Sequence, residues 1–86
     1  MVILIHGARS LKDKRRVVKS LAAQLRSRFN CSVAETDYLD QWKRAELTAC
    51  VVSNERRHAN QQLDEIIKFA ERHREAELAD VEIELI

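Results

Sequence analysis

The hydrophobic pattern between Arg9 and Phe29 predicts one long amphipathic helix. Apolar residues recur there at i, i+3, i+4 and i+7, the spacing that places side chains on one face of a helix. These residues are Leu11, Val18, Leu21, Ala22, Leu25 and Phe29. Ser10 and Asp13 fit a capping box, in which the two side chains satisfy free backbone amides at the start of the helix. We therefore expect Ser10 to be the N-cap.

A second helical pattern runs from Glu55 to about Arg74. Its apolar stripe consists of Ala59, Leu63, Ile66, Ile67 and Ala70, with Phe69 at the margin. Asn54 or Ser53 is the expected N-cap, because short polar side chains accept hydrogen bonds from the first free amides.

Four shorter segments have the pattern of β-strands. Residues 1–5 are a short apolar run, and residues 31–36 follow the first helix. Residues 44–53 alternate, and their apolar members should face the core because the other set contains the charge of Glu46. Those members are Ala45, Leu47, Ala49 and Val51. Residues 81–86, VEIELI, alternate cleanly and predict a last strand with one solvated face.

The predicted order of elements is strand, helix, strand, strand, helix, strand. Two helices with one apolar stripe each can cover only one face of a four-stranded sheet. The sequence therefore predicts an α+β fold, a ferredoxin-like βαββαβ sandwich with antiparallel strand order 4-1-3-2. Each β-α-β crossover should be right-handed. With 86 residues and no linker-like stretch, we expect a single domain over residues 1–86.

Charge is divided unevenly along the chain, although the net charge is only +1. Residues 1–34 contain eight Lys and Arg and one acid, whereas residues 35–86 contain seven Lys and Arg and thirteen acids. Six cations gather at the start of the first helix, where the helix dipole disfavours them unless an anion binds nearby. They are Arg9, Lys12, Lys14, Arg15, Arg16 and Lys19. This cluster indicates a phosphate- or RNA-binding surface, unless it is a solvated face or pairs with the acids of the C-terminal half.

Aromatic residues argue against base stacking on the sheet, because neither Phe is in a predicted strand and no aromatic is expected mid-strand on the open face. Tyr38 and Trp42 flank the predicted hairpin, where Trp42 either caps the core or takes part in an interface. Thr48 and Cys50 should lie on the open face of the sheet. These four residues are the predicted interface of a homo-oligomer, with a dimer expected.

Other classes of site find little support in the sequence. The acids Glu35, Asp37 and Asp40 are more typical of a turn than of a metal site, and the three histidines share no ligand spacing. No cofactor or metal is expected. No apolar run is long enough to span a bilayer, and no signal peptide is expected. We therefore expect a cytoplasmic protein with reduced cysteines and no membrane partner.

Three segments resemble the YlxP-like family of small bacterial proteins, a domain of unknown function. They are Ala8 to Val17, Ser32 to Ala45, and Val52 to Asn54. The resemblance implies a ferredoxin-like arrangement. The family's genes commonly lie beside those for translation initiation and ribosome maturation factors, which implies association with RNA or the ribosome. No catalytic activity is established for the family, so the resemblance supplies no active site.

An enzyme is the less favoured interpretation. Acylphosphatases have a similar topology and hold phosphate with an arginine in the first strand–helix loop, about where Arg9 falls. Their glycine-rich signature is absent, since Gly7 stands alone. The leading hypothesis is thus a non-catalytic factor that binds ribosomal RNA or the ribosome through the six cations. The alternative is a homo-oligomeric protein-interaction module with no nucleic-acid role.

Overall fold

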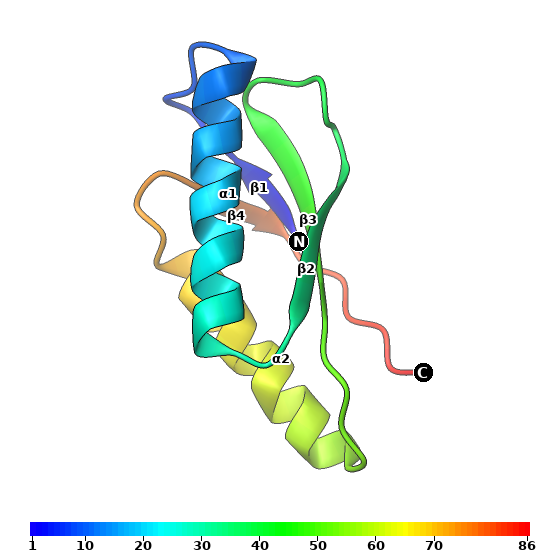
Figure 1. Ribbon diagram of the computed structural model, residues 1–86. Helices are drawn as coiled ribbons and strands as arrows, with labels where there is room; N and C mark the ends of the chain where they lie inside the picture. Colours follow the sequence, from blue (N-terminus) through cyan, green and yellow to red (C-terminus); the bar gives the residue numbers. More distant parts are fainter.

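Two helices and four strands follow one another in the predicted order (Figure 1). The computed structural model describes residues 1–86. The elements are β1 (Val2–Leu4), α1 (Leu11–Arg28), β2 (Ser32–Asp37), β3 (Arg44–Cys50), α2 (Arg56–Glu71) and β4 (Glu77–Asp80). Neither helix is long and apolar enough to cross a membrane.

The sheet has the strand order β2-β3-β1-β4, and every neighbouring pair is antiparallel. This is the predicted order 4-1-3-2 read from the other edge, so the ferredoxin-like α+β prediction is confirmed. Ile3 at the centre of β1 lies opposite Ala45 of β3 and Leu78 of β4. Both helices pack on one face of the sheet, as Figure 1 shows.

The core lies between α1 and the sheet, with a smaller contribution from α2. Leu21 and Leu25 of α1 are fully buried, as are Ala45 and Leu47 of β3. The remaining members of the core cluster are Ile3, Ile5, Ala8, Val17, Val18, Ala22, Val33, Ile66 and Ala76. The predicted inward set of β3 is confirmed, because Ala49 packs against the same cluster on the face of Ala45 and Leu47.

The start of α2 differs from the expectation. Its N-cap is Glu55, whose side chain makes no capping hydrogen bond. The predicted cap at Asn54 or Ser53 is therefore wrong. Ser53 instead accepts a hydrogen bond from the amide of Glu55 at 3.1 Å, which closes a local turn before the helix. The first turn of α2 contains no acid, so Glu55 at the N-cap is the one carboxylate at this end of the helix, and it makes no hydrogen bond to the free amides.

The last strand was predicted at residues 81–86, and that position is wrong. β4 is Glu77–Asp80, and residues 81–86 belong to no helix or strand. The physical reason is the register of β1, in which Val2 already lies opposite Asp80. Residues after Asp80 therefore run past the first residues of β1 and find no strand to pair with. The alternation of apolar and polar residues in 81–86 indicates a segment that could bury one face. It does not indicate whether another strand is available to pair with it.

Candidate phosphate-binding surface on helix α1

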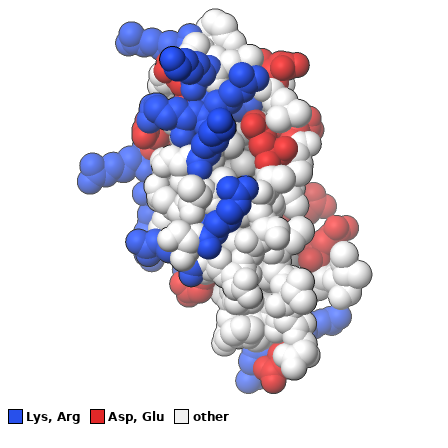
Figure 2. Space-filling model, in the orientation of Figure 1, with Lys and Arg blue, Asp and Glu red and all other residues white.

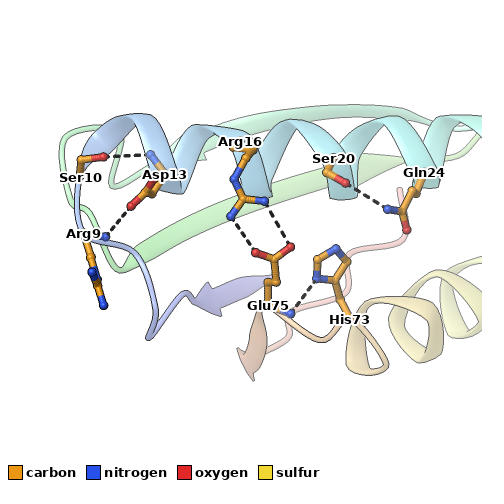
Figure 3. Close-up of polar contacts among 8 residues, drawn as sticks. All are labelled: Arg9, Ser10, Asp13, Arg16, Ser20, Gln24, His73 and Glu75. Carbon is orange, nitrogen blue, oxygen red and sulfur yellow. Dashed lines mark hydrogen bonds and ion pairs between the residues drawn. The ribbon is translucent and has the colours of Figure 1, made fainter.

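Hydrogen bonds at both sides of Ser10 fix the start of α1 (Figure 3). The amide of Asp13 donates to Ser10 Oγ at 3.1 Å, as the capping box predicts. The Asp13 carboxylate accepts from the amide of Arg9 at 3.0 Å, one residue earlier than in the standard motif. Ala8 is buried in the core and holds the loop from β1 in place. The one acid of the first turn is thus engaged with backbone and not with a basic side chain.

Exposed cations cover the solvent side of α1. Lys12, Arg15, Arg16 and Lys19 recur at helical spacing on one side, and Arg9 precedes them in the loop. All five side chains are exposed, and we call them the basic face. Figure 2 shows Lys and Arg gathered over α1, whereas Asp and Glu lie mainly toward the opposite side of that view. No carboxylate of the chain comes within 4.0 Å of the side-chain nitrogens of Arg9, Lys12, Arg15 or Lys19.

Arg16 is the one member of the basic face that the chain pairs with its own acid. Its guanidinium donates two hydrogen bonds to Glu75, at 2.8 and 3.3 Å (Figure 3). These bonds and the carboxylate charge raise the pKa of Arg16 above its ordinary value. Hydrogen bonding to Arg16 in turn lowers the pKa of Glu75. Both side chains remain about half exposed, so an incoming anion can reach this pair.

Lys14 was predicted among the phosphate-binding residues, and its position excludes it from them. Its side chain is fully buried, and Nζ lies 2.6 Å from Glu35 Oε2. Nζ also donates to the backbone oxygens of Tyr38 at 2.8 Å and Leu39 at 3.3 Å. A lysine held by three oxygens inside the molecule fastens the β2–β3 hairpin to α1 and cannot contact an external phosphate.

A cavity of about 490 Å³ adjoins the N-terminal end of the basic face. It lies between the loop after β1, the first turns of α1 and the loop before β4. Arg9, Arg16 and Arg74 line it together with Glu75 and Glu77. Glu77 is hydrogen-bonded to the ring of His6, which also lines the cavity. Of the three arginines, Arg9 and Arg74 have no carboxylate partner, whereas Glu75 and Glu77 already hold Arg16 and His6.

The four residues predicted as an interface come from two parts of the hairpin, the β2–β3 connection and β3. Tyr38 lies in the β2–β3 connection at a positive φ of 60°, with the Arg44 guanidinium 4.1 Å from its ring centroid. Trp42 of the same connection is 53% exposed and does not cap the core. Thr48 and Cys50 lie further along β3 and are exposed. Thr48 shares a hydrogen bond with Thr36 of β2, so part of the open face is already cross-linked by side chains.

Pairing of the cations with acids of the C-terminal half was one open alternative, but Glu35 and Glu75 were not identified individually as the partners. A signal existed for the first of them. Lys14 precedes Val18 by four residues and Leu21 by seven, which places it in the buried stripe of α1. Glu35 alternates in phase with buried Val33, so a charged pair inside the molecule follows from the two patterns together. Glu75 comes from a loop, for which the sequence offers no register.

The chain is similar to proteins of one family over most of its length. A family model described as "Protein of unknown function (DUF503)" matches residues 1–83. The chain is also 32% identical over 74 residues to "Uncharacterized protein YlxP" of Bacillus subtilis (strain 168). That match covers 86% of this chain and 80% of the Bacillus protein. By both measures, the chain belongs to the DUF503 family of YlxP-like proteins.

Proposed function

We propose that this protein binds RNA through phosphate contacts made by the basic face of α1. One observation carries the proposal: Arg9, Lys12, Arg15 and Lys19 are exposed cations that no carboxylate of the chain neutralises. The chain contains enough acids to neutralise these cations, since residues 35–86 hold six more acids than bases. It uses only two of them against this cluster, on Lys14 and Arg16.

The position of these cations on the helix strengthens the argument. A helix N-terminus carries about half a positive charge, and each cation beside it costs roughly 0.3–1 kcal/mol. Lys12 is in the first turn of α1, and Arg15 is in the second. Selection for stability alone favours acids at such positions. A bound phosphate removes the repulsion, because it supplies negative charge where the helix dipole and the cations both favour it.

The aromatic side chains support contact with the RNA backbone and not base stacking. Phe29 and Phe69 pack edge to face on each other, with ring centroids 6.2 Å apart. Tyr38 is covered on one side by Arg44. Phe29 is the C-cap of α1, Phe69 lies in α2 and Tyr38 follows the end of β2, so none of these rings is mid-strand, where RNA-recognition motifs place theirs. Binding should therefore be salt-dependent and weakly sequence-specific.

The gene neighbourhood of YlxP-like proteins, beside translation initiation and ribosome maturation factors, favours RNA over other polyanions as the partner. Ribosomal RNA, alone or within the ribosome, is the form of RNA that we propose.

A pull-down from bacterial lysate, with and without ribonuclease, tests the proposal. We expect the protein to retain ribosomal RNA, and a variant carrying Lys12→Glu, Arg15→Glu and Lys19→Glu to lose it. A matched control reverses three exposed cations elsewhere, Arg28, Lys68 and Arg72, and so changes the net charge equally. The control should retain RNA. Equal loss in both variants would show that net charge and not the basic face is responsible, and capture that survives the α1 reversal would refute the proposal.

A further inference from the structure

The edge of β3 that faces β1 is only partly covered. Lys43 and Leu47 make their backbone hydrogen bonds toward β1: Ile5 N donates to Lys43 O, Leu47 N donates to Met1 O at 2.8 Å, and the Met1 amino group donates to Leu47 O at 2.9 Å. Backbone groups along an antiparallel strand face alternate neighbours. Those of Ala49 and Val51 therefore face the same edge as Leu47. No strand lies beside them there, because β1 pairs with β3 only as far as Glu46.

The segment Val81–Ile86 has the pattern of a strand but no strand to pair with. It has the alternation of a strand, follows directly on β4, and makes no backbone hydrogen bond to the rest of the chain. Three of its apolar side chains are well exposed: Ile83 at 46%, Leu85 at 42% and Ile86 entirely. Exposed apolar side chains on an unpaired strand favour association with another edge.

Open space separates this segment from the body of the protein. Two cavities, of about 480 and 440 Å³, are lined on one side by the C-terminal segment and on the other by β3, the loop after it, and α2. Leu63 lines both cavities, and Ile66 and Ile67 line the larger one. The walls are mostly apolar, so an apolar strand entering here would be buried against α2.

Charge also favours a C-terminal segment, Val81–Ile86, as the strand that enters here. The first turn of α2 carries exposed Arg56 and Arg57 and contains no acid, and the N-cap, Glu55, offsets only one of the two charges and makes no capping hydrogen bond. Arg56 lines the smaller cavity. The C-terminal segment contains Glu82 and Glu84 and no base. An acidic strand beside an uncapped, basic helix N-terminus is electrostatically favourable.

From these features we propose that two copies of the chain exchange their C-terminal segments, so that Val81–Ile86 of each copy pairs with the free edge of β3 in the other. The directions of the strands are consistent with this. β3 and β4 are both antiparallel to β1, so the segment that prolongs β4 runs parallel to its own β3. A two-fold axis perpendicular to the sheet, between the two segments, makes every new pair antiparallel.

Beyond the end of β1, the strand order across the dimer is β2 and β3 of the first copy, the second copy's segment, the first copy's segment, and then β3 and β2 of the second copy. Such a contact closes under two-fold symmetry and leaves no free end for further growth. It also keeps α1 and α2 of both copies on one face of a continuous sheet. The two basic faces would then lie on the same side of the dimer.

The experiment is light scattering on a sizing column over a range of protein concentrations, without RNA. We expect the mass of two 10.0 kDa chains. Removal of residues 81–86 should give a monomer. Val51→Pro should do the same, because proline removes an amide that faces the free edge and no bond within the chain. Val52→Pro is the matched control, since the amide of Val52 faces away from that edge, and it should leave the dimer intact.

A pair of substitutions keeps the test independent of the chain ends. Ile83→Glu with Leu85→Glu should weaken the dimer by a factor of about 100 or more, because both carboxylates would have to leave water. Hydrogen exchange at the amides of Ala49 and Val51 should slow as protein concentration rises. A monomer at all concentrations, or a dimer that survives both the deletion and Val51→Pro, would overturn the proposal. Slow exchange in a monomer would overturn it too, because each segment would then pair within its own chain. None of these results depends on RNA binding.

Discussion

Replacement of Lys14 by methionine tests the buried ion pair between Lys14 and Glu35. Methionine keeps the length and the apolar stem of lysine but removes the ammonium that holds Glu35, Tyr38 and Leu39. The β2–β3 connection would lose its attachment to α1, and Glu35 would remain with only 16% of its side chain exposed and no cation beside it. We expect a large loss of stability without a change of fold.

The magnitude follows from the burial of the two partners. Removing one partner of a buried ion pair costs about 3–5 kcal/mol. Glu35 is not fully buried and can regain some hydration, so we take the lower end, about 3 kcal/mol. A domain of this size has a total stability of roughly 4–13 kcal/mol. At about 4–8 °C per kcal/mol, the melting temperature should fall by roughly 12–24 °C.

Urea denaturation followed by circular dichroism measures this loss. The companion variant Glu35→Gln keeps the shape of the acid without its charge, and the double variant should lose at least about 1 kcal/mol less than the sum of the single losses. If Lys14→Met stays within about 0.5 kcal/mol of the unmodified protein, a typical surface effect, then Lys14 is solvated in solution and our interpretation of the pair is wrong.

Three further predictions concern the start of α1. Ser10→Ala should cost about 1 kcal/mol in urea denaturation, because the Asp13 amide loses its acceptor; Ser10→Asp, which still caps, should not. Lys12→Glu should stabilise the protein by about 0.3–1 kcal/mol and weaken RNA binding. A variant that is less stable than the unmodified protein as well as weaker in RNA binding would contradict the dipole argument. The pKa of Glu75, followed by NMR titration, should lie below its ordinary value and return toward it in Arg16→Ala. Because the pKa of Glu75 is depressed in the folded state, its ionised form stabilises the folded protein above the unfolded-state pKa. This contribution disappears as the pH falls through the folded-state pKa. The Arg16→Ala protein should not show this loss of stability at acid pH.

The sequence predicted the parts of the fold that depend on local periodicity. The stripe of α1 and the alternation of β3 each define a buried face, and Leu21, Leu25, Ala45 and Leu47 are fully buried as expected. Those two faces and the order of elements sufficed for the sheet topology. The position of β4 was wrong because alternation scores a strand by its sidedness, and only the register of Val2 with Asp80 determines where pairing stops.

The candidate surface was predictable in outline and not in detail. Clustering of cations near the start of α1 is visible in the sequence, but two of the six predicted residues have partners within the chain. Lys14 could have been assigned to the buried side from its phase with Val18, whereas the contact between Arg16 and Glu75 depends on how the α2–β4 loop folds back. Long-range ion pairs between a helix and a loop have no periodic signature, so only the structure reveals which cations remain free.

The salt dependence of RNA affinity tests the central claim most directly. Four free cations on phosphates of an RNA duplex predict a slope of about −3.6 in a plot of log association constant against log salt concentration, if each contact releases counterions as on a B-form duplex. The variant with Lys12→Glu, Arg15→Glu and Lys19→Glu should bind far more weakly, with a slope of about −0.9 or shallower. The variant with reversed Arg28, Lys68 and Arg72 should keep the steep slope. An identical slope in all three proteins, or no RNA binding even at low salt, would contradict the account.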